Sequence, residues 1–148
     1  MLAALTEVSI ATDNRVIDAC WAEEEAARTG VAETLTNSGF QVLGQEADSS
    51  ETEFRAFLTI GAFGHMIEDG SCIVVLELAA EHLLTYRVPG SPDRLASSNL
   101  LVWRDSSVLS GPASGLPNVI LIEAMGLAQR FVLAAEEARR QVPAGRRG

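Results

Sequence analysis

The stretch from Leu116 to Gln141 constrains the fold more than any other part of this chain. It contains no proline after Pro117, and its apolar side chains recur at three- and four-residue steps. These side chains are Ile120, Ala124, Leu127, Phe131, Ala134 and Ala138. Such a period places one apolar stripe along an α-helix, and about 25 helical residues span roughly 37 Å. We therefore predict a long C-terminal helix that packs on a β-sheet.

A second helical pattern lies near the N-terminus. Thr12, Asp13 and Asn14 offer N-cap oxygens, and apolar residues then follow at helical spacing. The apolar positions are Val16, Cys20, Ala27, Val31 and Leu35. Gly30 weakens the middle of this segment, and Asn37-Ser38-Gly39 is typical of a helix C-terminus. The sequence predicts an N-terminal helix that ends near residue 37.

Three strands are expected next. Residues 40–46 form a short apolar segment, which we predict to be a strand, and a polar turn at residues 47–52 follows. Residues 53–60 alternate between apolar and polar side chains, and residues 72–78 are rich in β-branched side chains. Between the last two, Glu68-Asp69-Gly70-Ser71 is typical of a hairpin turn.

Residues 77–86 fit either a helix or a strand. Because Ala79-Ala80-Glu81 favours a helix over a hairpin turn, we predict a short middle helix that ends before Pro89-Gly90. Residues 99–104 form a further expected strand. Asp105-Ser106-Ser107 is interpreted as a turn, and residues 108–110 as a returning strand.

These elements predict an α+β fold with two layers. The expected order is α-β-β-β-α-β-β-α, with an antiparallel sheet of about five strands and helices at both ends and in the middle. The length of 148 residues suits one domain, which we place at residues 1–142. Residues 143–148 are expected to form a flexible basic tail.

Charge and composition narrow the function classes. The net charge of −9 makes nucleic acid and anionic membrane unsuitable partners. All 11 basic residues are arginine, so a Schiff-base lysine or a phosphate-loop lysine is excluded. The N-terminus lacks the pattern of a secretory signal, and Cys20 and Cys72 form no Cys-x-x-Cys pair. We expect a cytoplasmic protein with two buried, reduced cysteines.

Titratable side chains gather at two places. His65 lies near Glu68 and Asp69, but an Asp-Gly turn needs those residues for backbone reasons alone. Glu77 and Glu81 would share a helix face, while His82 would point elsewhere. The sequence therefore predicts no catalytic site, no metal site and no cofactor.

Three apolar side chains are candidates for partner binding. Phe57 lies on the polar side of its expected strand, and Trp103 shares a face with Leu101. Exposed aromatic and aliphatic groups on a sheet can bind a partner chain. The alternative is that both faces of the sheet are covered and that these side chains belong to the core.

The order of elements resembles that of the class I chaperones of bacterial type III secretion and the related YbjN-like proteins. The segment Leu101-Val-Trp-Arg-Asp-Ser-Ser-Val-Leu109 resembles the hairpin of that family, and Phe131-Val-Leu-Ala-Ala-Glu-Glu-Ala-Arg139 resembles its closing helix. The resemblance implies a cytosolic homodimer whose sheet holds an unfolded client polypeptide in extended form. It also implies a dimer interface on the middle helix, at Leu83, Leu84 and Tyr86.

We therefore expect a non-enzymatic, acidic, chaperone-like module that holds a partner polypeptide as a homodimer. The alternative is a small α+β enzyme or ligand-binding domain with a cavity between the sheet and the C-terminal helix. His65, Asp69 and His82 would be the candidate residues of that cavity.

Overall fold

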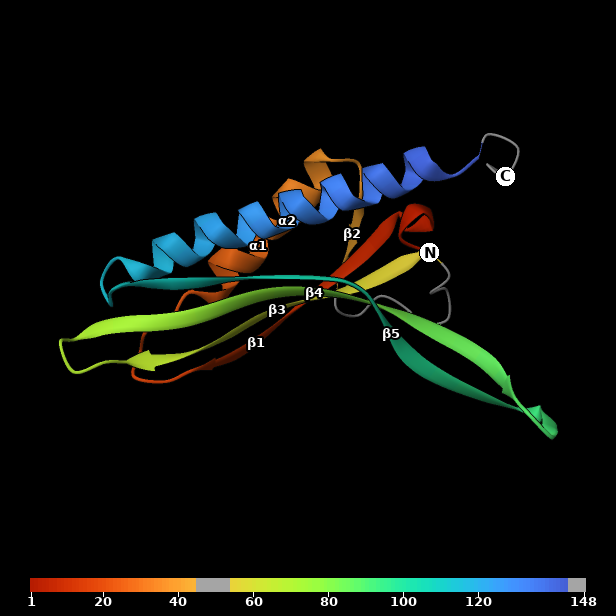
Figure 1. Cartoon of the computed structure of the whole chain (residues 1–148), viewed down its shortest axis with the longest axis horizontal. Coiled ribbons are helices and arrows are strands. Elements are labelled where there is room, and N and C mark those ends of the chain that lie inside the picture. The colour runs from red at the N-terminus through yellow and green to blue at the C-terminus, as the bar shows by residue number, and fades with distance from the viewer. Residues whose placement is uncertain (45–53, 144–148) are drawn as a thin grey trace.

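The structure, a computed structural model, describes residues 1–44 and 54–143. After a short 3-10 helix, η1 (Leu2–Ala4), come β1 (Glu7–Val16), α1 (Glu24–Asn37) and β2 (Gln41–Leu43). The chain continues through β3 (Arg55–Met66), β4 (Ser71–Val88), β5 (Ser91–Pro112) and α2 (Leu116–Gln141). In Figure 1 the two long helices lie together over one side of the strands. The predicted α+β fold with two layers and a five-stranded sheet is thus confirmed.

The sheet has the strand order β2-β1-β3-β4-β5. The pairs β3–β4 and β4–β5 are antiparallel, but β1 runs parallel to both of its neighbours, β2 and β3. The expectation of a wholly antiparallel sheet is therefore wrong at β1. The crossover through α1 returns the chain to the end of the sheet where β1 began, so that β2 runs parallel to β1. The connection from β2 to β3 passes through residues outside the described part of the chain.

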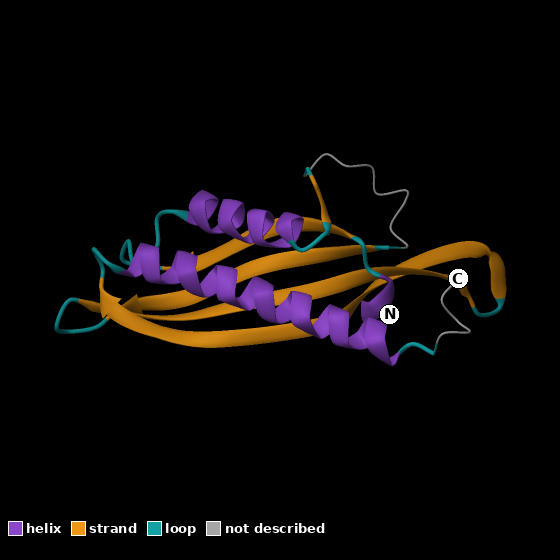
Figure 2. Cartoon of the chain, turned by 90° about the horizontal axis from the view of Figure 1, so that it is seen from above, coloured by secondary structure: helices purple, strands orange, loops and turns teal. Residues whose placement is uncertain are grey.

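The core lies between the sheet and α2, as the sequence predicted. One face of β3 and β4 buries alternate side chains, among them Leu58, Ile60, Leu76 and Leu78. The helix buries Leu116, Ile120, Ala124, Leu127, Ala128, Phe131, Val132 and Ala135 against them. Figure 2 shows α2 running obliquely across the strands, with α1 beside it.

The N-terminal helix begins later than predicted. Residues 7–16 form β1, and the chain turns at Asp18 and Ala19, both of which have positive φ angles, before α1 starts at Glu24. Val16, the first apolar position of the predicted helix, instead ends β1, because pairing with β3 along ten residues outweighs the helical spacing. Gly30 does not interrupt α1, and a Cβ added there would lie 2.8 Å from the Leu121 side chain of α2. Glycine thus lets the two helices approach closely.

The predicted middle helix is wrong. Residues 77–86 belong to β4, which pairs with β3 through Glu81 and with β5 along its whole length. Within this segment the even-numbered positions 78, 80 and 82 are buried, a period that only a strand explains. Long-range pairing on both sides outweighs the helix propensity of Ala79-Ala80-Glu81. The expected turn at residues 105–107 is also absent, because β5 continues through it.

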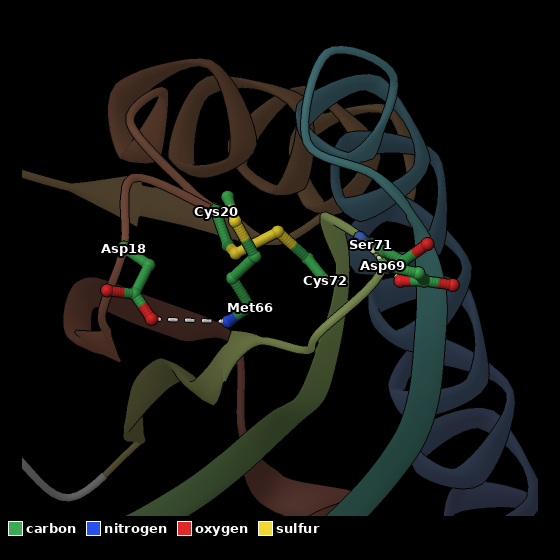
Figure 3. The surroundings of a disulfide bond; sticks show 6 residues. All are labelled: Asp18, Cys20, Met66, Asp69, Ser71 and Cys72. Carbon is green, nitrogen blue, oxygen red and sulfur yellow. Dashed lines mark hydrogen bonds between the residues drawn. A yellow bond between two sulfur atoms is a disulfide. The ribbon is translucent and has the colours of Figure 1, made fainter.

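The two cysteines form a disulfide rather than the reduced pair that the sequence analysis expected. The turn at Asp18 and Ala19 carries Cys20 to the start of β4, where Cys72 lies (Figure 3). Asp18 helps to hold this turn, since its carboxylate accepts a hydrogen bond from the Met66 backbone N–H. The bond closes a loop of 52 residues in sequence separation, worth about 4 kcal/mol in the chain-entropy account.

Two predictions concern residues beyond the described part of the chain. The polar turn at residues 47–52 lies outside it, and so do all but the first residue of the tail predicted at residues 143–148.

Candidate functional site

The sheet has an open face, which we define as the side opposite α1 and α2. Two rows of side chains cross this face in register. Phe63 of β3, Val75 of β4 and Val108 of β5 form one row, and their exposed fractions are 39%, 38% and 73%. Cross-strand neighbours of this kind contact each other, so the row is a continuous apolar strip. The guanidinium of Arg15 lies 5.4 Å from the Phe63 ring centroid and borders the strip.

The second row contains two of the predicted partner-binding residues. Phe57 of β3 pairs with Glu81 of β4, and Glu81 pairs with Leu101 of β5. Phe57 is half-buried and Leu101 is exposed, and both lie on the open face. Asn99 donates a hydrogen bond to the Glu81 carboxylate at 3.0 Å, which fixes the acidic group between the two apolar ones.

Trp103, the third predicted partner-binding residue, faces the other way. The register of β4 with β5 shifts between Ala80 and Glu81, so that Val102 is an extra residue and the face of β5 switches there. Trp103 pairs with Ala80 and contacts Phe131 of α2 in an edge-to-face geometry, with 5.4 Å between the ring centroids. The bulge thus places Leu101 on the open face and Trp103 under the helix.

The far end of β4 and β5 forms a projecting arm, which we define as residues 83–88 and 91–100. The pairing of β3 with β4 stops at Phe57 and Glu81, so within the described residues the arm is a two-stranded ribbon. Figure 1 shows it extending past the other strands. It carries exposed Tyr86, Leu95 and Leu100, the second of which is 68% exposed. An isolated two-stranded ribbon is marginally stable in water.

The predicted dimer-interface residues all lie on this arm. Leu83 and Leu84 are half-buried, and Tyr86 is 49% exposed. The middle helix expected to carry them does not exist, but the structure still brings them together on one element.

The outer edge of β5 is the third feature of the site. β5 is the last strand in the sheet order and spans 22 residues, and its described backbone pairs only with β4. The opposite edge strand, β2, has three residues. A long edge of unpaired N–H and C=O groups is a template for another strand.

The titratable candidates do not converge. His65 is exposed on the open face, in register with Ile73, and His82 is buried on the core face, where its Nδ1 lies 2.9 Å from the Arg55 carbonyl oxygen. Ile73, the partner of His65, and His82 are nine residues apart on β4, which is about 30 Å at the rise of a strand. Among the described residues, no three histidine, cysteine or acidic side chains are grouped to hold a metal.

Asp69 has a structural role in the β3–β4 turn. Its carboxylate accepts a hydrogen bond of 2.8 Å from the Ser71 backbone N–H (Figure 3). This bond, together with one from the Ser71 side chain, lowers the pKa of Asp69 below its ordinary value of 3.8. The alternative interpretation, that Asp69 serves the Asp-Gly turn, fits this geometry.

The acidic pair Glu77 and Glu81 lies on the open face instead of a helix face. Glu77 forms an ion pair of 3.7 Å with Arg104, and Glu81 is held by Asn99. His82 points to the opposite side of the sheet, as alternation in a strand requires.

A cavity of about 420 Å³ lies between α1, β1 and β2. Its lining includes Ile10 and Val42 as apolar contributions and Glu25, Arg28 and Glu33 as charged ones. It is neither between the sheet and α2 nor near His65, Asp69 or His82, the positions expected for a ligand-binding domain.

Sequence reasoning missed the row of Phe63, Val75 and Val108. The predicted turn at residues 68–71 fixes the hairpin register, so the pairing of Phe63 with Val75 was available from the sequence. Val108 was not, because the register of β5 depends on the bulge at Val102.

Comparisons with known proteins identify the fold alone. No protein-family model and no curated protein matches the chain. The PelC dodecamer from Paraburkholderia phytofirmans has a similar structure, with a TM-score of 0.51 and 16% sequence identity over 86% of this chain and 88% of that one. A putative neuraminyllactose-binding hemagglutinin homolog from Helicobacter pylori aligns at a TM-score of 0.37 and 12% identity, over 90% of each chain.

Proposed function

We propose that this chain is a non-enzymatic, acidic, chaperone-like module that holds a partner polypeptide in extended form. The partner adds a strand to the outer edge of β5 and lays alternate side chains against the open face. The observation that carries this proposal is the length of β5, an edge strand of 22 residues beside a strip of exposed apolar side chains. Strand addition supplies main-chain hydrogen bonds, and neighbouring side chains supply selectivity.

Two apolar positions of β5 would contact the partner directly. Leu101 and Val108 point to the open face and are 46% and 73% exposed. Phe57 extends the surface inward, and Leu83 of the arm, two residues after Glu81 on the same side of β4, extends it lengthwise. We therefore assign Leu83 to the same partner site, whereas Leu84 and Tyr86 lie on the other side of the arm.

Charge bears on which segments the site would select. The net charge of −9 and the carboxylates of Glu77 and Glu81 on the open face favour partner segments that are neutral or basic. Nucleic acid is disfavoured for the same reason.

The disulfide supports an oxidising compartment for this activity rather than the expected cytoplasm. Disulfides such as Cys20–Cys72 persist in secreted and periplasmic proteins and are rare where glutathione keeps thiols reduced. A type III secretion chaperone would work in the cytosol, and its dimer-supporting helix is a strand here. We therefore propose that the chain holds a client polypeptide, as the resemblance implies, but that it does so at the β5 edge.

The test measures binding of a fluorescently labelled, permanently unfolded basic protein, reduced and carboxamidomethylated ribonuclease A, by anisotropy. Leu101→Asp and Val108→Asp place charge on the partner side of exposed positions, so the fold is kept and affinity falls at least about tenfold, or about 1.4 kcal/mol. Ile17→Asp is the matched control, because Ile17 is 61% exposed and follows β1, three strands from β5 in the sheet order. Wild-type protein that fails to bind, or equal losses in all three variants, would contradict the proposal.

The cavity between α1 and β2 favours a second candidate function, a small-ligand-binding domain. Its volume of about 420 Å³ lies within the range of ligand pockets, and its lining includes a positive charge at Arg28 and a negative charge at Glu25. The check is a thermal-shift screen of small organic acids and amines with wild type and with Ala32→Trp, which fills the space. Shifts that survive in Ala32→Trp would remove the cavity as their origin.

A further inference from the structure

The outward side of α2 carries an apolar stripe that the core does not use. Val119, Ile122 and Leu133 are 44%, 63% and 60% exposed. At 3.6 residues per turn they lie together on the helix, on the side opposite the buried residues Ala124 and Ala135. We call Val119, Ile122, Gly126 and Leu133 the outer stripe.

Gly126 lies at the middle of the outer stripe, and no contact within the described chain requires a glycine at this position. Glycine in a helix interior is destabilising relative to alanine. At Gly30 the reason is clear, because an added Cβ would meet Leu121 at 2.8 Å. At Gly126 an added Cβ meets no described atom within 4 Å. A glycine with open space beside it on an apolar stripe suits the close approach of another helix.

The counterpart of Ile122 is Arg130, but Val119 and Leu133 are symmetric about Gly126. Val119 and Leu133 each lie seven residues from it, which is two helical turns on either side. If two copies of α2 cross antiparallel at Gly126, Val119 of each copy meets Leu133 of the other, as an isologous two-fold interface requires. We propose that a second copy of this chain packs on the outer stripe in this antiparallel arrangement.

Charges at the helix ends fit the same arrangement. The N-cap of α2 is Gly115, which offers no side-chain hydrogen bond to the first helical N–H groups. Under the same symmetry Glu137 of the partner subunit lies opposite Gly115, and a carboxylate is favoured at the positive end of a helix. Within its own helix Glu137 pairs with Arg140, which lies one turn further from the crossing.

This dimer goes beyond the proposed polypeptide binding and does not depend on it. The two helical layers meet at the centre, and both open faces and both β5 edges point outward. The surface is distinct from the arm residues Leu83, Leu84 and Tyr86, so failure of one surface leaves the other unaffected.

The first test is sedimentation equilibrium of the full chain. Wild type is expected to be a dimer, and Gly126→Leu is expected to raise the dimer dissociation constant at least tenfold while the helical circular-dichroism melt is kept or improved. A Cβ added at Gly126 meets no described atom within 4 Å, so a larger side chain there is expected to block only a close helix crossing. A monomeric wild type, or an unchanged dimer in Gly126→Leu, overturns the proposal.

The second test fixes the register. Val119→Lys and Leu133→Glu are each expected to weaken the dimer at least tenfold, and the double variant is expected to regain most of the affinity, because opposite charges then meet across the antiparallel pair. A parallel pair would bring like charges together and show no recovery. Absence of recovery in a folded double variant therefore overturns the antiparallel arrangement.

A membrane is the competing occupant of the outer stripe. Among the described residues one helix, α2, is long and apolar enough to cross a bilayer by length and composition, with a mean hydropathy of 1.4 in its most apolar window. Flotation with phosphatidylcholine and phosphatidylglycerol vesicles separates the two cases. Vesicle binding by wild type that Ile122→Asp abolishes, together with a monomer in solution, would overturn the dimer.

Discussion

Arg139 ties the two ends of the chain together. From the last turn of α2 its guanidinium donates hydrogen bonds to the backbone carbonyls of Leu5 at 2.7 Å and Ala3 at 3.3 Å. The same group lies 5.2 Å from the centroid of the Phe40 ring. One side chain thus anchors the segment before β1 and the residue before β2 to the helix.

We expect Arg139→Ala to lower the free energy of unfolding by about 2 kcal/mol, because it removes charge-assisted hydrogen bonds to two carbonyl groups. Urea unfolding measures the change. Arg140→Ala is the matched control, since Arg140 is exposed and pairs only with Glu137 among the described contacts, and it should change stability by less than about 0.5 kcal/mol. Equal losses in the two variants would refute this role of Arg139.

Asp69 provides a prediction about pH. Hydrogen bonds from Ser71 lower its pKa in the folded state, so the carboxylate stabilises the fold above the pKa of the unfolded chain. That contribution is lost as the pH falls through the lowered folded-state pKa. Asp69→Asn should therefore remove part of the decline in stability below about pH 4, as measured by urea unfolding from pH 6 to pH 2. Identical slopes in wild type and variant would show that the turn does not depend on the charge.

Local periodicity predicted some elements and misassigned others. The range of α2 was correct, because 26 residues of amphipathic pattern with Pro117 near the start leave no competing structure. Residues 77–86 were misassigned, because the pairing that makes them a strand joins residues far apart in sequence. The same reason applies to Val16, which was interpreted as the first apolar position of a helix and instead ends β1. The hairpin turn at residues 68–71 was correct, since Asp-Gly determines it locally.

The disulfide joins the turn after β1 to the start of β4 and should dominate the stability of this end of the sheet. We expect reduction to lower the free energy of unfolding by about 4 kcal/mol, as the loop-closure estimate gives. Thermal unfolding with and without dithiothreitol measures it. The variant with both Cys20→Ser and Cys72→Ser should match the reduced wild type and show no response to dithiothreitol. A response in that variant would point to an effect of the reagent itself.

The candidate site illustrates where sequence reasoning stopped. Phe57 and Leu101 lie on the open face, because each follows the alternation of its own strand, and their role in partner binding stays a prediction. Trp103 was grouped with Leu101, and only the bulge at Val102 separates their faces. The cysteine pairing likewise needed the tertiary structure, since no local spacing indicates it. Register and long-range pairing, rather than residue type, determined what could not be predicted.

At the scale of the whole molecule, two helices shield one side of the sheet and leave the other side and the β5 edge available. Amide hydrogen exchange with and without the unfolded polypeptide tests directly whether that edge is where a partner binds. We expect alternate amides of β5, those that point away from β4, to exchange at least tenfold more slowly in the complex. Binding that leaves the β5 amides unchanged, or that protects only α2 or the cavity beside α1, would contradict the account.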